Sequence, residues 1–293
     1  NQTSINVDLT RTLLDIDLSD LLKIPDTTIT QLFSPTFTIS NVPPGYTFVN
    51  SVEEHSIDLE GAQLKKIRVS QGKIRIKVYN PLNTKVYYTI QLPGAVKNGQ
   101  TFEQTYFVDA GTIQQPTTSE EELDLSGYEL DLRGESGLNY NILQSRLSIK
   151  TDPNGPAVSI SSQYDFKFEG FLSGLKIDYA KGYFGNQTIS DTSNFNIPYL
   201  NKIIGGAIDL PLTNLIFSIE NGMKVSLKGN VILAENTNFN NNTVSLSSSN
   251  IGSAFYISPA TGSWSTLQPT TQNLNFNSTN SNIEQYIENL GAT

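Results

Sequence analysis

Apolar and polar side chains alternate along most of this chain with a period of two residues. In the segment 73–79, for example, Ile74, Ile76 and Val78 share one face of an extended chain, because successive side chains of a strand point to opposite sides. The pattern is rich in Val, Ile, Tyr, Phe and Thr and predicts strands with one dry and one wet face. We therefore expect an all-β fold of antiparallel β-sandwich modules. The other clear segments are 57–59, 84–92, 128–132, 158–168 and 215–220.

Gly, Pro and Asn supply turn signals between these segments. They occur at 42–45, 152–155, Asn98-Gly99 and Asn221-Gly222. Asn-Gly suits the type I′ turn because both central residues must accept a positive φ. The pattern predicts β-hairpins at these places rather than catalytic loops.

One short helix is expected near the C-terminus, at 281–290. Ser281 and Glu284 have the spacing of a capping box, and Gly291 stands where a C-terminal glycine belongs. Apolar residues recur between them at helical spacing: Ile283, Tyr286, Ile287 and Leu290. At the other end of the chain, 14–18 alternate like a strand, whereas 19–25 fit one helical turn.

A domain boundary is predicted in the polar segment 111–122, which lacks periodicity and ends in an acidic run. We expect a β-sandwich-like module at 1–112 and a larger β module at 120–293 that ends in the helix. The segments 73–92 and 214–233 resemble each other, since in each a strand ends at Asn plus a breaker and a second strand follows. An internal repeat and an ordinary hairpin both explain this likeness.

The composition argues against several functions. With 19 basic and 28 acidic residues, the chain is repelled by a phosphate backbone, so we expect no nucleic-acid partner. No apolar run reaches the roughly 20 residues of a membrane span. The absence of cysteine excludes thiolate chemistry. The densest basic patch is expected on the wet face of strands: Lys65, Lys66, Arg68, Lys73, Arg75 and Lys77.

His55 is the only histidine, and a hydrolase triad needs one such base. However, the sequence has no Gly-x-Ser-x-Gly elbow, and Glu53 and Glu54 beside His55 indicate an exposed strand end. One histidine and no cysteine leave zinc and copper without their preferred ligands. We nominate no catalytic residue and expect no cofactor and no metal.

Carboxylates and aromatic residues leave three weaker alternatives. Paired acids about 5 to 9 Å apart can hydrolyse glycosides, but the acids here are expected on wet faces or in loops. A polar turn explains the Asp and Asn cluster at 191–196 better than a calcium site does, because no EF-hand loop is present. Trp264 and the pair Tyr183-Phe184 suit either sugar stacking or a core. The acids considered for glycoside hydrolysis are Asp15, Asp17, Glu120, Glu121, Glu122, Glu129 and Asp131. The residues considered for calcium are Asp191, Asn194 and Asn196.

Two resemblances bear on the setting. The strand, Asn-Pro, strand arrangement at 78–92 resembles the start of the late-embryogenesis-abundant or water-stress β-sandwich. The segments 174–185, 208–233 and 273–290 resemble uncharacterised exported proteins of Bacteroidetes. The second resemblance implies a surface or periplasmic setting and further β domains downstream, and it brings no catalytic residues.

We therefore expect a non-catalytic exported protein that acts as an adhesion, scaffold or accessory binding module. Its setting would be the cell surface, the outer membrane or the periplasm, with a lipid anchor upstream of residue 1 as one means of attachment. The expected partner is a cell-envelope protein or a surface glycan, and the ligand-binding residues are unknown. A glycan- or lipid-binding protein is the alternative, and a carboxylate-based glycoside hydrolase is the third option.

Overall fold

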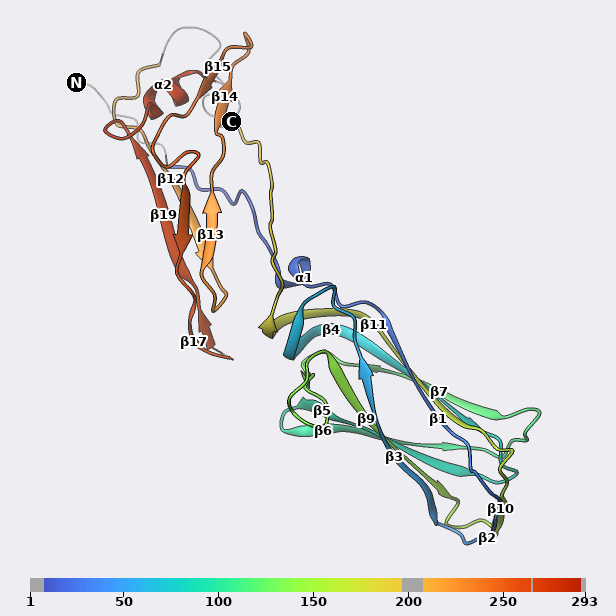
Figure 1. Cartoon of the computed structure of the whole chain (residues 1–293). Coiled ribbons are helices and arrows are strands. Elements are labelled where there is room, and N and C mark those ends of the chain that lie inside the picture. Colours follow the sequence, from blue (N-terminus) through green and yellow to red (C-terminus); the bar gives the residue numbers. More distant parts are fainter. Residues whose placement is uncertain (1–7, 197–207, 265, 291–293) are drawn as a thin grey trace. The chain divides into compact units, whose positions relative to one another are not determined.

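The computed structural model describes residues 8–196, 208–264 and 266–290 and consists mainly of antiparallel strands (Figure 1). The expected all-β fold is confirmed. The chain divides into two compact units: unit 2 spans 15–189, and unit 1 contains 1–14 and 190–293. The boundary expected between 112 and 120 therefore differs from the observed one, since these residues connect two strands inside unit 2.

Unit 2 holds the first short helix and the first series of strands. They are α1 (Leu18–Leu21), β1 (Thr27–Phe33), β2 (Ile39–Val42), β3 (Thr47–Ser56), β4 (Gln63–Asn80), β5 (Val86–Lys97), β6 (Gln100–Val108), β7 (Thr117–Asp124), β8 (Glu129–Asp131), β9 (Ile142–Thr151), β10 (Val158–Ile160) and β11 (Phe166–Tyr183).

Two antiparallel layers make the sandwich of unit 2. In one layer the order is β7-β4-β11-β1, and in the other it is β6-β5-β9-β3. The short strand β8 pairs with both β4 and β5 and thereby joins the layers. β2 and β10 form a separate small pair.

The alternation in β4 decides which face is dry. Ile74, Ile76 and Val78 are at most 1% exposed, and they belong to one continuous core with residues of the opposite layer. Burial of each such side chain contributes roughly 1.5–3 kcal/mol to stability. Lys73 and Arg75 alternate with them on the wet face, as expected.

The predicted type I′ turn at Asn98-Gly99 is confirmed. The φ angles are 52° at Asn98 and 79° at Gly99, and the two residues connect β5 to β6. The equivalent prediction at Asn221-Gly222 is wrong. Neither residue is among those with a positive φ, and Asn221 ends a strand whose chain then passes to a different sheet.

Unit 1 holds the remaining elements. They are β12 (Asn214–Asn221), β13 (Leu227–Asn230), β14 (Glu235–Thr237), β15 (Thr243–Ser245), β16 (Ala254–Ile257), β17 (Thr261–Ser263), β18 (Thr266–Gln268), β19 (Thr270–Asn277) and α2 (Ile283–Glu288). β12 pairs with β19, and β13 pairs with β16. β14 with β15 and β17 with β18 form two small hairpins.

A buried asparagine organises the crossing between the layers of unit 2. Asn80, fully buried at the end of β4, donates from Nδ2 to the carbonyl oxygens of Thr84 (2.8 Å), Val108 (3.2 Å) and Asp109 (2.8 Å). Its Oδ1 accepts from the N–H of Leu82 at 2.9 Å. One carboxamide therefore ties the β4–β5 link to the end of β6, and it satisfies backbone groups that would otherwise be buried without partners.

Asn221 makes the same bonds in unit 1. It is 1% exposed and donates from Nδ2 to the carbonyl oxygens of Val225 (2.8 Å) and Ser258 (2.9 Å). Its Oδ1 accepts from the N–H of Met223 at 2.9 Å. We call this arrangement the asparagine corner.

The strand register shows that the two corners belong to equivalent frameworks. Asn80 lies opposite Thr117 of β7, and Asn221 lies opposite Thr270 of β19. A main-chain bond of 2.7 Å closes each corner, from Gly111 to Leu82 in unit 2 and from Ala260 to Met223 in unit 1. β4, β5, β6 and β7 therefore correspond to β12, β13, β16 and β19, and the likeness between 73–92 and 214–233 is an internal structural repeat.

Several local predictions need correction. The segment 57–59 is buried at both ends but forms no strand, and 158–168 is broken between β10 and β11. The helical turn near the N-terminus is α1, whereas 14–17 form no regular element. The capping box is wrong, because α2 begins after Asn282, whose carboxamide bonds to Ser245 and Ser247 instead. Gly291 lies outside the described residues.

Replacement of either corner asparagine tests this framework. Asn80→Ala leaves several buried carbonyl oxygens without a donor and is expected to lower the free energy of unfolding by about 2–3 kcal/mol. Asn221→Ala is expected to do the same in unit 1. Urea unfolding measures both, with far-UV circular dichroism for Asn80 and Trp264 fluorescence for Asn221.

Two exposed strand asparagines serve as matched controls for these variants. Asn50→Ala on β3 and Asn273→Ala on β19 are expected to change stability by less than about 0.5 kcal/mol. Equal losses for the corner and control variants would contradict the role of the corner.

Candidate binding cleft

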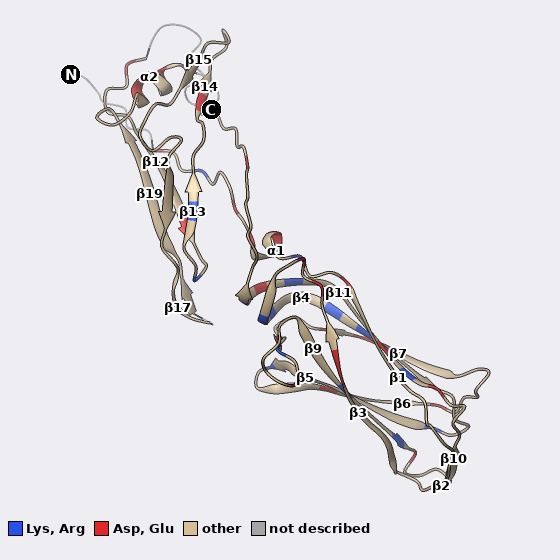
Figure 2. Ribbon diagram, in the orientation of Figure 1, with Lys and Arg blue, Asp and Glu red and all other residues tan. Residues whose placement is uncertain are grey.

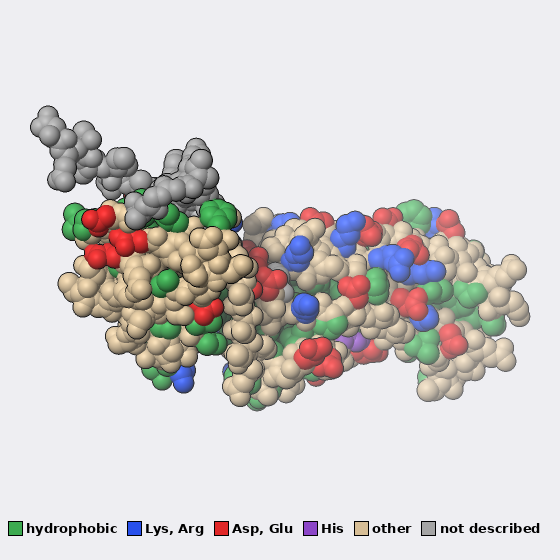
Figure 3. All heavy atoms as spheres, turned by 90° about the horizontal axis from the view of Figure 1, so that it is seen from above, with side chains coloured by type: hydrophobic (Ala, Val, Ile, Leu, Met, Phe, Trp, Pro, Cys, Tyr) green, Lys and Arg blue, Asp and Glu red, His purple; other side chains and the backbone are tan. Residues whose placement is uncertain are grey.

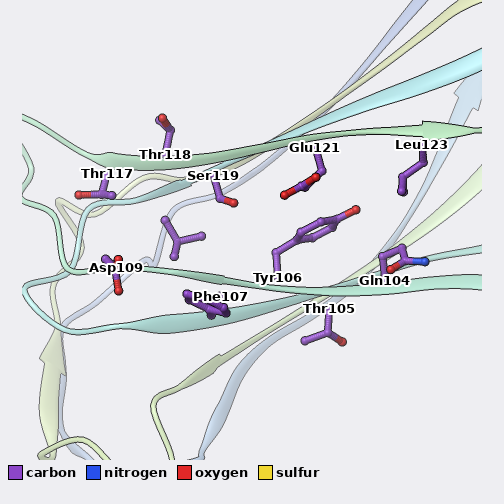
Figure 4. A pocket seen from close by; sticks show the side chains of 11 residues that line it. Gln104, Thr105, Tyr106, Phe107, Asp109, Thr117, Thr118, Ser119, Glu121 and Leu123 are labelled. Atoms are coloured by element: carbon purple, nitrogen blue, oxygen red, sulfur yellow. The ribbon is translucent and has the colours of Figure 1, made fainter.

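Two strand edges of unit 2 face each other across an open gap. Within the described residues, β6 pairs only with β5, and β7 pairs only with β4. Between the two strands lies a cavity of about 470 Å³, which we call the β6–β7 cleft (Figure 4). Its lining residues are Gln104, Thr105, Tyr106, Phe107, Val108, Asp109, Thr117, Thr118, Ser119, Glu121 and Leu123.

Glu121 interrupts the alternation of β7. Thr117, Ser119 and Leu123 share its face of the strand and are half-buried, whereas Glu121 is exposed. In Figure 4 its side chain lies across the cleft from Tyr106. A carboxylate on the inward face of an edge strand keeps this side of the sandwich wet, because burying it without a partner is costly.

Tyr106 brings an unused polar group to the cleft. Its hydroxyl group is buried and has no hydrogen-bond partner. Burial raises the pKa of Tyr106 to about 12, and the negative charge of Glu121 adds to the shift. The hydroxyl is therefore neutral at pH 7, and leaving it unsatisfied costs about 1–3 kcal/mol.

Phe107 and Thr105 are engaged on the other face of β6. The ammonium group of Lys85 lies 4.8 Å from the centroid of the Phe107 ring, and the ring of Tyr87 lies 6.5 Å from it. Lys85 also forms an ion pair of 3.5 Å with Asp109. The Thr105 hydroxyl group lies 2.9 Å from that of Thr89. These residues line the cleft mainly through their backbone.

The repeat shows how the corresponding side of unit 1 is closed. By strand register, Glu121 and Leu123 correspond to Leu274 and Phe276 of β19, which are 5% and 0% exposed. Both belong to one buried cluster with Ile283, Tyr286 and Ile287 of α2. The same framework is thus covered by an apolar helix in unit 1, whereas in unit 2 it carries a carboxylate and an open cleft.

His55 does not form a triad. It is half-buried on β3, and its Nε2 lies 2.7 Å from Oγ of Ser145. The Ser145 hydroxyl group donates to Oε1 of Gln31 at 3.4 Å and not to the histidine, and no carboxylate bonds to the other ring nitrogen of His55 among the described residues. Burial lowers the pKa of His55, which keeps the ring neutral at pH 7.

The acids considered for glycoside hydrolysis are engaged mainly in ion pairs on wet faces. Glu129 pairs with Lys66, and Asp131 pairs with Arg133 at 2.5 Å. Glu122 pairs with Lys73 at 2.5 Å, whereas Glu120 lies 3.6 Å from Arg75 and 3.8 Å from Lys77. These pairs place the basic patch of β4 beside acids of the neighbouring strands (Figure 2). Asp15 and Asp17 are exposed.

The surface carries mixed charge accordingly. On the face of unit 2 seen in Figure 3, blue and red side chains are interspersed, and no broad area of one sign stands out. Isolated surface pairs of this kind contribute about 0–1 kcal/mol each. The basic patch is therefore a solvated face, as expected, and not a preformed anion site.

The other candidates fall in separate places. Asp191, Asn194 and Asn196 are all exposed, and no three His, Asp or Glu side chains among the described residues could hold a metal ion. Tyr183 is 52% exposed, whereas Phe184 packs against the core of unit 2. Trp264 is half-buried in unit 1.

Neither described helix has the length or the apolar character needed to cross a lipid bilayer. No protein-family model matches the sequence, and no curated protein matches it. Among solved structures, the empty head of turnip yellow mosaic virus is 12% identical with a TM-score of 0.22, covering 60% of this chain and 91% of that one. Sacbrood virus of honeybee is 12% identical with a TM-score of 0.24, covering 66% and 92%. Likenesses this low carry no argument about this chain.

Sequence reasoning missed Tyr106 and considered Glu121 only as an acid on a wet face or in a loop. The acidic run Glu120–Glu122 ends the segment predicted as a domain boundary, whereas it lies inside β7. The alternation of the strand could have identified Glu121. It lies two residues before Leu123 and so shares its face, whereas Glu120 and Glu122 lie on the opposite face.

The neutral His55 predicts a pH dependence of stability. Burial lowers the pKa of His55 in the folded chain, so the folded chain binds a second ring proton less tightly than the unfolded chain, in which the pKa of His is about 6.5. Protonation therefore favours unfolding, and this contribution to stability is lost as the pH falls below about 6.5. Urea unfolding of the wild type and His55→Gln between pH 7 and 5 is expected to give a shallower loss in the variant. Equal slopes would contradict the assignment.

Proposed function

We propose that this chain is a non-catalytic, exported binding module of the cell envelope. It acts in adhesion, as a scaffold or as an accessory subunit, and it recognises its partner at the β6–β7 cleft. The rigid sandwich holds the two free edges in place, and sheet edges with their loops are common recognition surfaces on such frames. The exported setting rests on the resemblance to exported proteins of Bacteroidetes.

The single observation that carries the proposal is the buried, unsatisfied hydroxyl group of Tyr106, a residue that lines an open cleft. A buried polar group without a partner is costly and is the exception in folded proteins. The internal repeat supports this argument, because the corresponding side of unit 1 is covered by α2. A partner that fills the β6–β7 cleft would satisfy the hydroxyl group.

A glycan is the second candidate for this cleft. The hydroxyl groups of Tyr106, Thr117 and Ser119, together with the carboxylate of Glu121, provide hydrogen-bonding groups of the kind that sugars use. A lipid is less suitable, because a carboxylate and several hydroxyl groups line the cavity. Glycoside hydrolysis finds little support, since most of the acids considered for it are held in ion pairs.

Binding to an envelope fraction of the cells that make the protein tests this function. Ser119→Trp fills the cleft from β7 and is expected to weaken binding by about tenfold or more. Glu120→Trp is the matched control, because Glu120 is exposed on the opposite face of β7 and is not one of the residues that line the cleft. Glu121→Lys provides a second cleft variant. Circular dichroism checks that each variant folds.

A panel of chromogenic glycosides completes the test and is expected to show no turnover by the wild type. Turnover that depends on Glu121 would contradict the proposal. So would absence of binding by the wild type, or equal binding by the Ser119 and Glu120 variants.

A further inference from the structure

The wall of the cleft on the β6 side is a backbone edge. Six consecutive residues, Gln104 to Asp109, line the cavity, although their side chains alternate between the two faces of the strand. A cavity that touches side chains on both faces of β6 must also touch the edge of the strand between them. The β7 side differs, because beyond Ser119 only Glu121 and Leu123 contribute.

A free strand edge offers a row of N–H and C=O groups for pairing. Within the described part of the chain, β6 uses one edge for β5 and leaves the other without a strand. An additional antiparallel strand satisfies such groups along its whole length, which is how many domains bind extended peptides. The edge spans nine residues, enough for a strand of ordinary length.

The charge of the cleft selects the partner's side chain. Glu121 and Asp109 are the only charged lining residues, and Asp109 already pairs with Lys85. On β7, Glu120 and Glu122 pair with basic residues of β4, whereas no ion pair of Glu121 occurs in the described structure. A Lys or Arg side chain would therefore find an available carboxylate at the centre of the cleft.

The aromatic residues favour a peptide over a glycan. Sugars stack on open ring faces, whereas the exposed ring of Phe107 lies on the opposite face of β6 from Tyr106, beside Lys85. Tyr106 is half-buried, and its hydroxyl group is buried without a hydrogen-bond partner, so the ring offers no fully open face. The cleft thus supplies strand pairing and hydrogen bonds but little stacking surface.

On the basis of the proposed function, we propose that β6 takes up an extended segment of a partner protein as an additional antiparallel strand. A Lys or Arg of that segment lies against Glu121, and its neighbours alternate between apolar and polar. This chain carries a net charge of −9, so a basic segment is more readily supplied by a different protein than by a second copy.

Selection from a displayed library of random peptides of about ten residues tests this inference on the full chain. Enriched peptides are expected to alternate and to carry a central Lys or Arg. Fluorescence anisotropy then gives their affinities. Glu121→Lys is expected to weaken binding by about tenfold or more, whereas Glu122→Lys, the same change on the opposite face of β7, leaves it nearly unchanged.

Two changes in the peptide complete the design. Replacing its central Lys or Arg with Glu is expected to restore binding to the Glu121→Lys variant. N-methylation of one set of alternate amides is expected to abolish binding, whereas methylation of the other set is tolerated, because only every second amide of an edge strand faces its neighbour.

Several outcomes would overturn the inference. They are a failure to enrich any peptide, equal effects of the Glu121 and Glu122 variants, tolerance of methylation at both sets of amides, or a glycan that competes for the cleft. An inward carboxylate that only protects the edge from aggregation would give the first outcome. If envelope binding still depends on Ser119, that outcome removes the strand mechanism but leaves the proposed function intact.

Discussion

The buried carboxamide of one asparagine is the interaction on which each sandwich depends. A chain that passes from one layer to the other must bury backbone groups at the corner, where no strand can pair with them. Asn80 supplies donors and an acceptor to both segments that cross there, and Asn221 does the same in the other unit. The hydrophobic layers pack in register because these links are held at fixed points.

The repeat separates what the framework requires from what each unit adds. Both units keep the corner and the two strand pairs attached to it. They differ on the open side, where β19 carries apolar residues beneath α2 and β7 carries Glu121 beside a wet cleft. Since the framework is shared, this difference in polarity is a property of the individual strands, and the proposed function rests on it.

The alternation predicted most of the local structure, because strand faces follow directly from side-chain periodicity. The strands at 73–79 and 215–220 and the turn at Asn98-Gly99 all depend on neighbouring residues. The domain boundary was not predictable in this way, since β7 pairs with β4 across a long stretch of chain. The dipeptide Asn221-Gly222 has the sequence of a turn, but the Asn221 side chain donates to the carbonyl oxygen of Ser258, which is distant in sequence, and so forms the asparagine corner.

The candidate cleft lay beyond sequence reasoning for the same reason. Nothing near Tyr106 in the sequence shows that its hydroxyl group lies beside Glu121 and is buried without a partner. The capping box at Ser281 failed because Asn282 is taken by Ser245 and Ser247, which are distant in sequence. Non-local contacts therefore decide both the binding surface and the points where local signals mislead.

Amide hydrogen exchange, resolved residue by residue by NMR, tests the shared corner most directly. The amides of Leu82 and Gly111 in unit 2, and of Met223 and Ala260 in unit 1, donate the bonds that close the two corners. All four are expected to exchange as slowly as the core strands of their own unit. Slow exchange at Leu82 and Gly111 with loop-like exchange at Met223 and Ala260 would show that the two units do not share one framework.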